Sequence, residues 1–360
     1  MHALSTPLSI RRPRRETGLT LIELMLAMLI GLFLLLGTLT VFTQSRQNFR
    51  VSDSIARLQE NARFALDTIE PDLRLARFWG RNATPGAIPG PTDPGFPAGV
   101  AITCDTVDTS GARIPPTTYT AWALNMLQDV WAVDETSGYG HNRLGIPCTP
   151  NTAAQPDSDA LVVRHASGQT FAPTPGRVQV HADHLAGQIF NNGAVPAGFD
   201  PLAQTHNVMV NVYYVDQGSD LDPNVPSLRV KTLVNGGIHQ EQELIAGVEN
   251  LQVQFGVDTD DPNDGIVDRY VDADHAIINP TNPGTIPTAK IRAIRLWMLM
   301  RADAQENGFQ DRATYTSPDP VINTCAPGPA CDYPNNFRRL AVSKTIFLRN
   351  NRSVLLSTAP

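Results

Sequence analysis

Seven aspartates crowd into one short stretch of the chain, and their side chains could bind a metal ion. They are Asp258, Asp260, Asp261, Asp264, Asp268, Asp272 and Asp274. Calcium prefers oxygen ligands, and Gly265 permits the sharp turn that such loops need. The stretch predicts either a solvated acidic hairpin or a structural Ca²⁺ site, with Asp258, Asp260, Asp264 and Asp268 as candidate ligands. The spacing does not match an EF-hand loop. If Asp260 is taken as position 1, a proline occupies position 3 and a valine occupies position 12, and both positions supply calcium ligands in an EF-hand.

Cysteine chemistry is a second possibility. The chain has four cysteines, which all follow its long apolar segment: Cys104, Cys148, Cys325 and Cys331. An even number of cysteines in an exported domain predicts disulfide bonds, and three pairings are open. We favour Cys325–Cys331 because the connecting residues are short and turn-rich, which leaves Cys104–Cys148. The spacing is not CxxC, so zinc binding or thioredoxin chemistry is not favoured.

Signals for catalysis are weak. His181 and His184 have a spacing that a metal could use, but no third ligand is evident and they are not part of an HExxH helix. The chain has no GxSxG elbow, no Walker loop and no GxGxxG. A net charge of −7 argues against a broadly basic nucleic-acid-binding surface. The sequence therefore predicts no enzyme and no cofactor other than calcium, although a triad dispersed along the chain stays open.

A long apolar segment near the N-terminus is the element to which the rest of the chain is attached. Leu24 to Thr43 contains no ionisable residue, and at 1.5 Å per residue it spans about 30 Å, the thickness of a bilayer core. Four arginines precede it: Arg11, Arg12, Arg14 and Arg15. Such a basic flank predicts that this end stays in the cytoplasm. Glu23 lies at the membrane edge, where an ionisable group usually has a partner.

The order of these features resembles the class III signal of type IV prepilins and type II secretion pseudopilins. A basic leader is followed by Gly18, apolar residues, and Glu23 at the fifth place after the glycine. The resemblance implies that prepilin peptidase cuts between Gly18 and Leu19 and methylates the new terminus. It also implies that Glu23 pairs with a neighbouring subunit's terminal amine during assembly. Leu19 departs from the usual phenylalanine, and an ordinary one-pass anchor is the alternative.

An amphipathic helix is predicted to continue beyond the membrane, over residues 44–80. Its apolar stripe recurs at steps of three and four: Val51, Ile55, Leu58, Ala62, Ala65, Ile69, Leu73 and Ala76. We expect this stripe to pack on the chain's own sheet, with a kink or a fresh helical start at Pro71. Three segments in and after this helix resemble the PilW family of minor pilins: RLQENARFAL (57–66), DLRLA (72–76) and FWG (78–80). Pro71 and Arg77 depart from that pattern, where a helix former and a glycine are common.

Beyond residue 80 the sequence predicts a β-rich domain over 81–360. Residues 81–156 are rich in proline and glycine and are expected to form an irregular insertion, with a short helix over 121–133. Strand signals follow at 160–165, 179–181, 208–215, 228–234, 242–257, 294–301 and 341–350. In the strand at 294–301, we expect Ile294, Leu296, Met298 and Met300 to face the core. Residues 243–258 and 341–350 again resemble PilW. The predicted fold class is α+β, type IV pilin-like, with one long helix packed on an antiparallel sheet.

The resemblance implies a minor pilin that helps to initiate the type IV pilus near its tip. After loss of the leader (1–18), residues 19–43 would cross the inner membrane once, and the domain would lie in the periplasm. The implied partners are prepilin peptidase, other minor pilins and the major pilin. A GspJ-type pseudopilin, an adhesin that binds through residues 81–156, and an anchored periplasmic enzyme are the alternatives.

Overall fold

The protein is described by a computed structural model that covers residues 18–104, 116–133, 154–155, 157–260, 264–273, 275–278, 288–306, 308–318, 321–325 and 333–350. The chain divides into two compact units, Met1–Asp53 and Ser54–Pro360. The long helix α1 (Leu21–Leu75) contributes to both. In the first unit its large apolar side chains are exposed, and in the second one face of it is buried.

Helix α1 runs through Pro71 without interruption, so there is no fresh helical start there, and a kink, the other expectation, stays a prediction. The helix ends four residues later, where Arg77 adopts a left-handed φ of 65°. This conformation favours glycine, so an arginine adopts it at some cost in free energy. The amphipathic segment therefore ends at Leu75, slightly earlier than expected.

Three sheets make up the β structure that the described residues form. The largest has the order β1-β8-β7-β6-β3-β2, with β4 paired to β5 and β6. Its strands are β1 (Thr103–Cys104), β2 (Val130–Val133), β3 (Ala160–Thr170), β4 (Pro175–Ala182), β5 (Gly187–Asn192), β6 (Gln204–Asp216), β7 (Ser227–Val234) and β8 (Ile238–Ala246). All of its pairings are antiparallel except β1 with β8.

The second sheet is antiparallel and has the order β10-β9-β11-β15. Its strands are β9 (Val248–Asp258), β10 (Arg269–Asp272), β11 (Lys290–Arg301) and β15 (Arg339–Phe347). A small third sheet joins β12 (Thr314–Thr316), β13 (Val321–Cys325) and β14 (Tyr333–Pro334). The predicted α+β fold is confirmed, but α1 packs on two main sheets rather than one.

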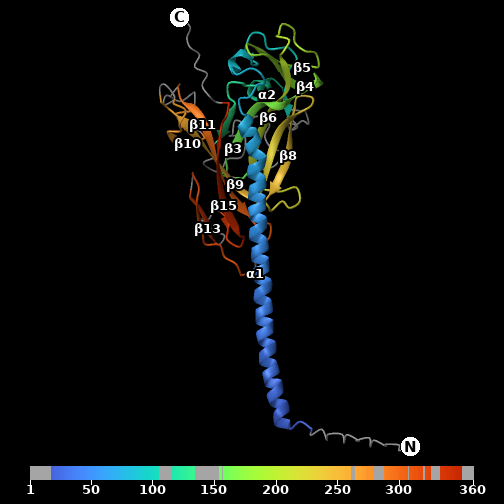
Figure 1. Cartoon of the computed structure of the whole chain (residues 1–360), viewed down its shortest axis with the longest axis vertical. Coiled ribbons are helices and arrows are strands. Elements are labelled where there is room, and N and C mark those ends of the chain that lie inside the picture. Colours follow the sequence, from blue (N-terminus) through green and yellow to red (C-terminus); the bar gives the residue numbers. More distant parts are fainter. Residues whose placement is uncertain are drawn as a thin grey trace, which may run out of the picture. The chain divides into compact units, whose positions relative to one another are not determined.

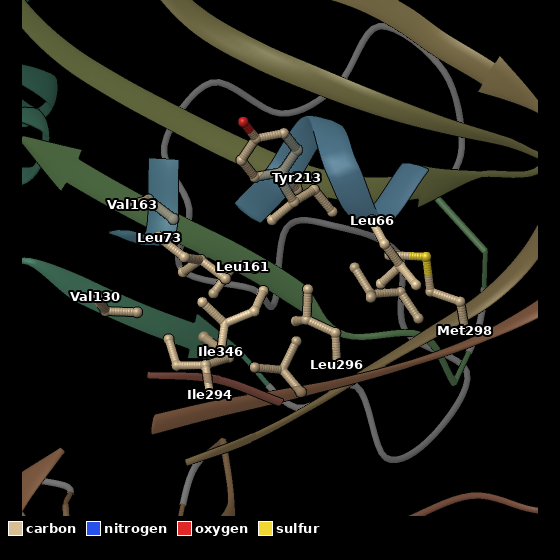
Figure 2. Close-up of a cluster of buried hydrophobic side chains, with 14 of the residues drawn as sticks. Leu66, Leu73, Val130, Leu161, Val163, Tyr213, Ile294, Leu296, Met298 and Ile346 are labelled. Carbon is tan, nitrogen blue, oxygen red and sulfur yellow. The ribbon is translucent and has the colours of Figure 1, made fainter. Parts of the chain in front are cut away.

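One apolar core is shared by α1 and both main sheets (Figure 1). The helix contributes Leu58, Ala62, Ala65, Leu66, Ile69, Leu73 and Ala76. Figure 2 shows Leu73 beside Val163 and Leu161 of the first sheet, and Leu66 beside Met298 of the second. The predicted core face of β11 is confirmed. Its other face is also buried at Trp297 and Leu299, against Tyr333.

The region 81–156 is built into the domain in its described parts. A 3₁₀ turn (Pro85–Ala87), β1, α2 (Pro116–Ala123) and β2 lie within it. Buried residues from this region form a second core with β4, β5 and β6; they include Ile88, Ile102, Leu124 and Met126. The predicted helix over 121–133 is wrong, because α2 ends at Ala123 and residues 130–133 pair with β3 instead.

Candidate functional site

The predicted processing and assembly residues surround the first turn of α1. Gly18 and Leu19 are exposed and precede the helix. Thr20 is its N-cap: the Thr20 hydroxyl accepts from the Glu23 backbone N–H (3.3 Å), and Glu23 Oε2 accepts from the Thr20 N–H (3.0 Å) and hydroxyl (2.9 Å). This reciprocal arrangement is a capping box. Glu23 therefore has a partner within its own chain, which was not predicted from the sequence.

The helix that follows has the character of a membrane anchor. Its most apolar 18-residue window has a mean hydropathy of 2.5 and no buried residue, and it lies near the N-terminus. Gly31 and Gly37 border open space, because a Cβ added at either position would meet nothing within 4 Å. This part of the helix is bare on all sides, so it is available for packing against lipid or other helices.

In the second unit, a buried polar cluster fastens the last turns of α1 to the first sheet. Asp72 Oδ2 accepts from the Tyr213 hydroxyl (2.5 Å) and from Asn211 Nδ2, and His165 Nε2 lies 3.3 Å from Asp72 Oδ1. Burial alone would raise the pKa of Asp72, but interactions with His165, Tyr213 and Asn211 outweigh it and lower the pKa. The carboxylate is thus held ionised where the helix meets the sheet.

A second attachment joins α1 to the edge strand β15. Lys344 Nζ lies 2.5 Å from Glu70 Oε2 and 3.0 Å from Asp67 Oδ1. The hydrogen bond to Glu70 is the main reason that the pKa of Lys344 is raised. Asn350 Nδ2 donates to the carbonyls of Arg74 (3.4 Å) and Ala76 (3.1 Å), which lie at the helix end and have no partner within the helix.

Two buried arginines organise other parts of the domain. Arg339 Nε and Nη2 donate to both oxygens of Glu249 (2.5 and 3.1 Å), which joins β15 to β9 across β11. Arg164 on β3 donates to the carbonyls of Ala123 (3.2 Å), Gln128 (2.6 Å) and Trp122 (3.0 Å). Burial lowers the pKa of Arg164 to about 10. These charges have partners that hold the fold together.

The predicted calcium ligands lie at the β9–β10 connection. Asp258 is fully buried, and its Oδ2 accepts from Arg292 Nε (2.9 Å) and Nη2 (2.7 Å). Asp268 Oδ2 accepts from the Thr259 N–H (2.6 Å) and hydroxyl (2.8 Å). Asp264 Oδ1 accepts from a backbone N–H two residues on. Several carboxylate oxygens that could bind calcium therefore already accept hydrogen bonds from the protein itself.

Asp260 is exposed, as are Asp264 and Asp268. The pKa of Asp260 is raised, chiefly by the negative charge of Asp268, then by desolvation and by Asp264 and Asp258. Within the described ranges, which omit 261–263 and 274, no group of three or more His, Cys, Asp or Glu is arranged to hold a metal ion. Calcium binding stays a prediction.

The remaining predicted sites can be placed only in part. His181 Nδ1 lies 2.8 Å from Thr205 Oγ1, and its ring packs edge-on against Phe199, so it has a structural place in the domain. Cys104 ends β1 and Cys325 ends β13. Cys148 and Cys331 lie outside the described residues, so the disulfide pairing stays a prediction.

Comparison with known families agrees with this arrangement. The prokaryotic N-terminal methylation motif matches residues 13–39, which include Gly18, Leu19 and Glu23. An apolar N-terminal helix with this motif, followed by an antiparallel β domain on its second half, makes the chain a type IV pilin-like protein. Within that class, residues 212–350 match the type IV pilus-assembly protein W family, PilW.

The PilW match runs from β6 to just beyond β15, so it includes the whole second sheet. A solved type IV-like pilin from Thermus thermophilus is 14% identical, with a TM-score of 0.25, over 55% of this chain and 82% of that one. No curated protein matches the chain.

Proposed function

We propose that this protein is a minor pilin that takes part in initiating the type IV pilus. The observation that carries the proposal is an exposed apolar helix with a methylation motif, continuous with the helix on which a PilW-type domain packs. The pilin-like class supports a structural rather than a catalytic role. The buried charges support the same conclusion, because each one described above has a structural partner.

The proposed first step is removal of residues 1–18. Cleavage between Gly18 and Leu19 leaves a terminal amine on Leu19, just before the capping box of Thr20 and Glu23. In the assembled filament Glu23 then pairs with the amine of a neighbouring subunit. The apolar residues up to Phe49 pack against other helices, first in the bilayer and then in the filament.

The proposed location follows from the same helix. The subunit waits in the inner membrane with a single span, and the β domain lies in the periplasm. Its partners are prepilin peptidase, other minor pilins and the major pilin. The described parts of 81–156 support assembly over a separate adhesin, because they fill the protein's own second core. A pseudopilin of type II secretion would share these features, and neighbouring genes would separate the two.

The test is intact-mass measurement of the membrane form, with and without a functional prepilin peptidase. We expect loss of residues 1–18 and gain of one methyl group on Leu19 only when the peptidase is active. A chain that keeps its leader, or is cut elsewhere, in cells with active peptidase would contradict the proposal.

A further inference from the structure

Two arginines follow the apolar segment of α1, and the proposed processing and assembly do not use them. Arg46 and Arg50 lie in the first unit and are both exposed. They are four residues apart, so they share one face of the helix. From Leu24 to Ser52 there is no acidic residue. Within the described part of the chain, neither arginine forms an ion pair.

Like charges at this spacing repel each other weakly, and an anion bound between the two arginines would relieve that repulsion. Aromatic rings accompany the two arginines. The Arg46 guanidinium lies 5.6 Å from the ring centroid of Phe42, and Phe49 is 76% exposed. Arginines beside aromatic side chains are typical anchors at the boundary between a bilayer and water.

Their depth can be worked out from the helix. If Leu24 to Thr43 crosses the hydrocarbon core, Arg46 and Arg50 lie about 4.5 and 10 Å beyond it along the axis. The polar headgroup layer on each side is about 5–7 Å thick. Arg46 is then within that layer. Arg50 lies just outside it and reaches back with its long side chain.

We propose that Arg46 and Arg50 bind the phosphates of anionic phospholipids in the outer leaflet of the inner membrane, which fixes the depth of the waiting subunit. This inference rests on the proposed membrane insertion. After cleavage the four leader arginines are gone, so this pair holds the nearest basic side chains to the bilayer. A guanidinium matches phosphate geometry with two parallel hydrogen bonds, so each arginine can hold one headgroup.

The experiment is native mass spectrometry of the processed chain, which begins at Leu19 and lacks the leader arginines, in mild detergent with equimolar phosphatidylglycerol and phosphatidylcholine. The wild type should retain phosphatidylglycerol in preference. An Arg46→Gln/Arg50→Gln variant should lose that preference, by about fivefold for each arginine removed. The matched control is Arg63→Gln/Arg74→Gln, which removes the same charge from arginines that already pair with Asp67 and Glu70. That control should behave like the wild type.

Two further measurements separate the possible failures. An Arg46→Lys/Arg50→Lys variant keeps the charge and should keep most of the preference. Equal phosphatidylglycerol retention by the wild type and the double glutamine variant would overturn the inference.

Resistance of the wild type to alkaline carbonate extraction shows whether the chain is inserted in the membrane at all. Release by carbonate would overturn the membrane part of the proposed function, and this inference with it.

Discussion

At the residue scale, the carboxylate of Glu23 has two possible roles. In the free chain it completes a capping box with Thr20, which uses Oε2. In the proposed filament it pairs with the amine of another subunit. A capping box works with glutamine as well as glutamate, because both side chains accept a hydrogen bond. Pairing with an amine depends on the negative charge. The two roles therefore respond differently to substitution.

This difference gives a prediction. We expect Glu23→Gln to be cleaved and inserted but to lose co-purification with other pilins, because the charge is gone. Thr20→Val removes the hydroxyl of the N-cap, which costs about 1 kcal/mol of helix stability, but it keeps the charge and should still assemble. Pilus counts and co-purification measure the outcome. If Glu23→Gln assembled normally and Thr20→Val did not, Glu23 would act as a cap and not as an assembly residue.

Asp72 gives a pH-dependent prediction. Its pKa is lowered in the folded protein, so the stability that it contributes is present above the unfolded-state pKa of about 4 and is lost as pH falls through the folded value. At pH 7, Asp72→Asn should lower the free energy of unfolding by about 1–3 kcal/mol. Below pH 4 this difference should shrink.

The measurement is urea unfolding of the full chain in detergent between pH 7 and pH 3, followed by tryptophan fluorescence. All four tryptophans lie in the second unit, so the signal reports on the domain that contains Asp72. Tyr213→Phe serves as the control, because it removes one donor to Asp72 and leaves the carboxylate in place. A difference between wild type and Asp72→Asn that is the same at pH 7 and pH 3 would contradict the assigned cause.

At the scale of elements, Gly247 is the point where the chain passes from the first sheet to the second. It separates β8 from β9, has a φ of 88°, and its N–H and carbonyl bond to Pro226 and Arg301. A Cβ here would lie 2.7 Å from the Arg301 carbonyl oxygen. We expect Gly247→Ala to destabilise the domain by about 2–5 kcal/mol, from the left-handed backbone and the close contact together.

The matched control is Gly265→Ala, which has the same φ of 88° but no atom within 4 Å of the added carbon. Gly265→Ala should lower the free energy of unfolding by only about 1–2 kcal/mol, which is the cost of the left-handed backbone alone. Unfolding midpoints in urea give both values. If both variants lost the same free energy of unfolding, the close contact between the added Cβ at position 247 and the Arg301 carbonyl oxygen would relax without cost.

The β9–β10 connection gives the prediction for calcium. The raised pKa of Asp260 reflects repulsion among neighbouring carboxylates, which a bound cation would relieve. If the connection holds Ca²⁺, a saturating concentration should raise the thermal midpoint by about 5 °C relative to EDTA. Asp264→Asn should reduce that shift. Identical midpoints in calcium and EDTA would favour the solvated acidic hairpin.

Some elements could be predicted from local patterns, and others could not. The strands β6 and β11 were predictable because their alternation of apolar residues reports directly on burial. The segment 242–257 has the pattern of one strand, and only the glycine at 247 signals the crossing between sheets. Residues 121–133 resemble a helix locally. Val130 to Val133 become a strand because β3 offers a pairing partner, which a single sequence does not reveal.

At the scale of the whole molecule, the N-terminal methylation motif was predictable because its residues are close together in sequence, from Gly18 to Glu23. The polar contacts that hold the domain were missed because their partners are far apart. Asp72 bonds to a tyrosine 141 positions away, and Arg339 to a glutamate 90 positions away. Buried charges of this kind have no sequence signature until the topology is known.

The core that joins α1 to both sheets has a consequence for how the protein is made. Helix α1 leaves the ribosome well before β15, the last described strand. Both contribute to one core, to which α1 supplies Leu66 and β15 supplies Ile346 (Figure 2). This core therefore cannot close until β15 has been made. If the domain is exported as proposed, the chain crosses the membrane with this core open, and the core closes only when export is almost complete.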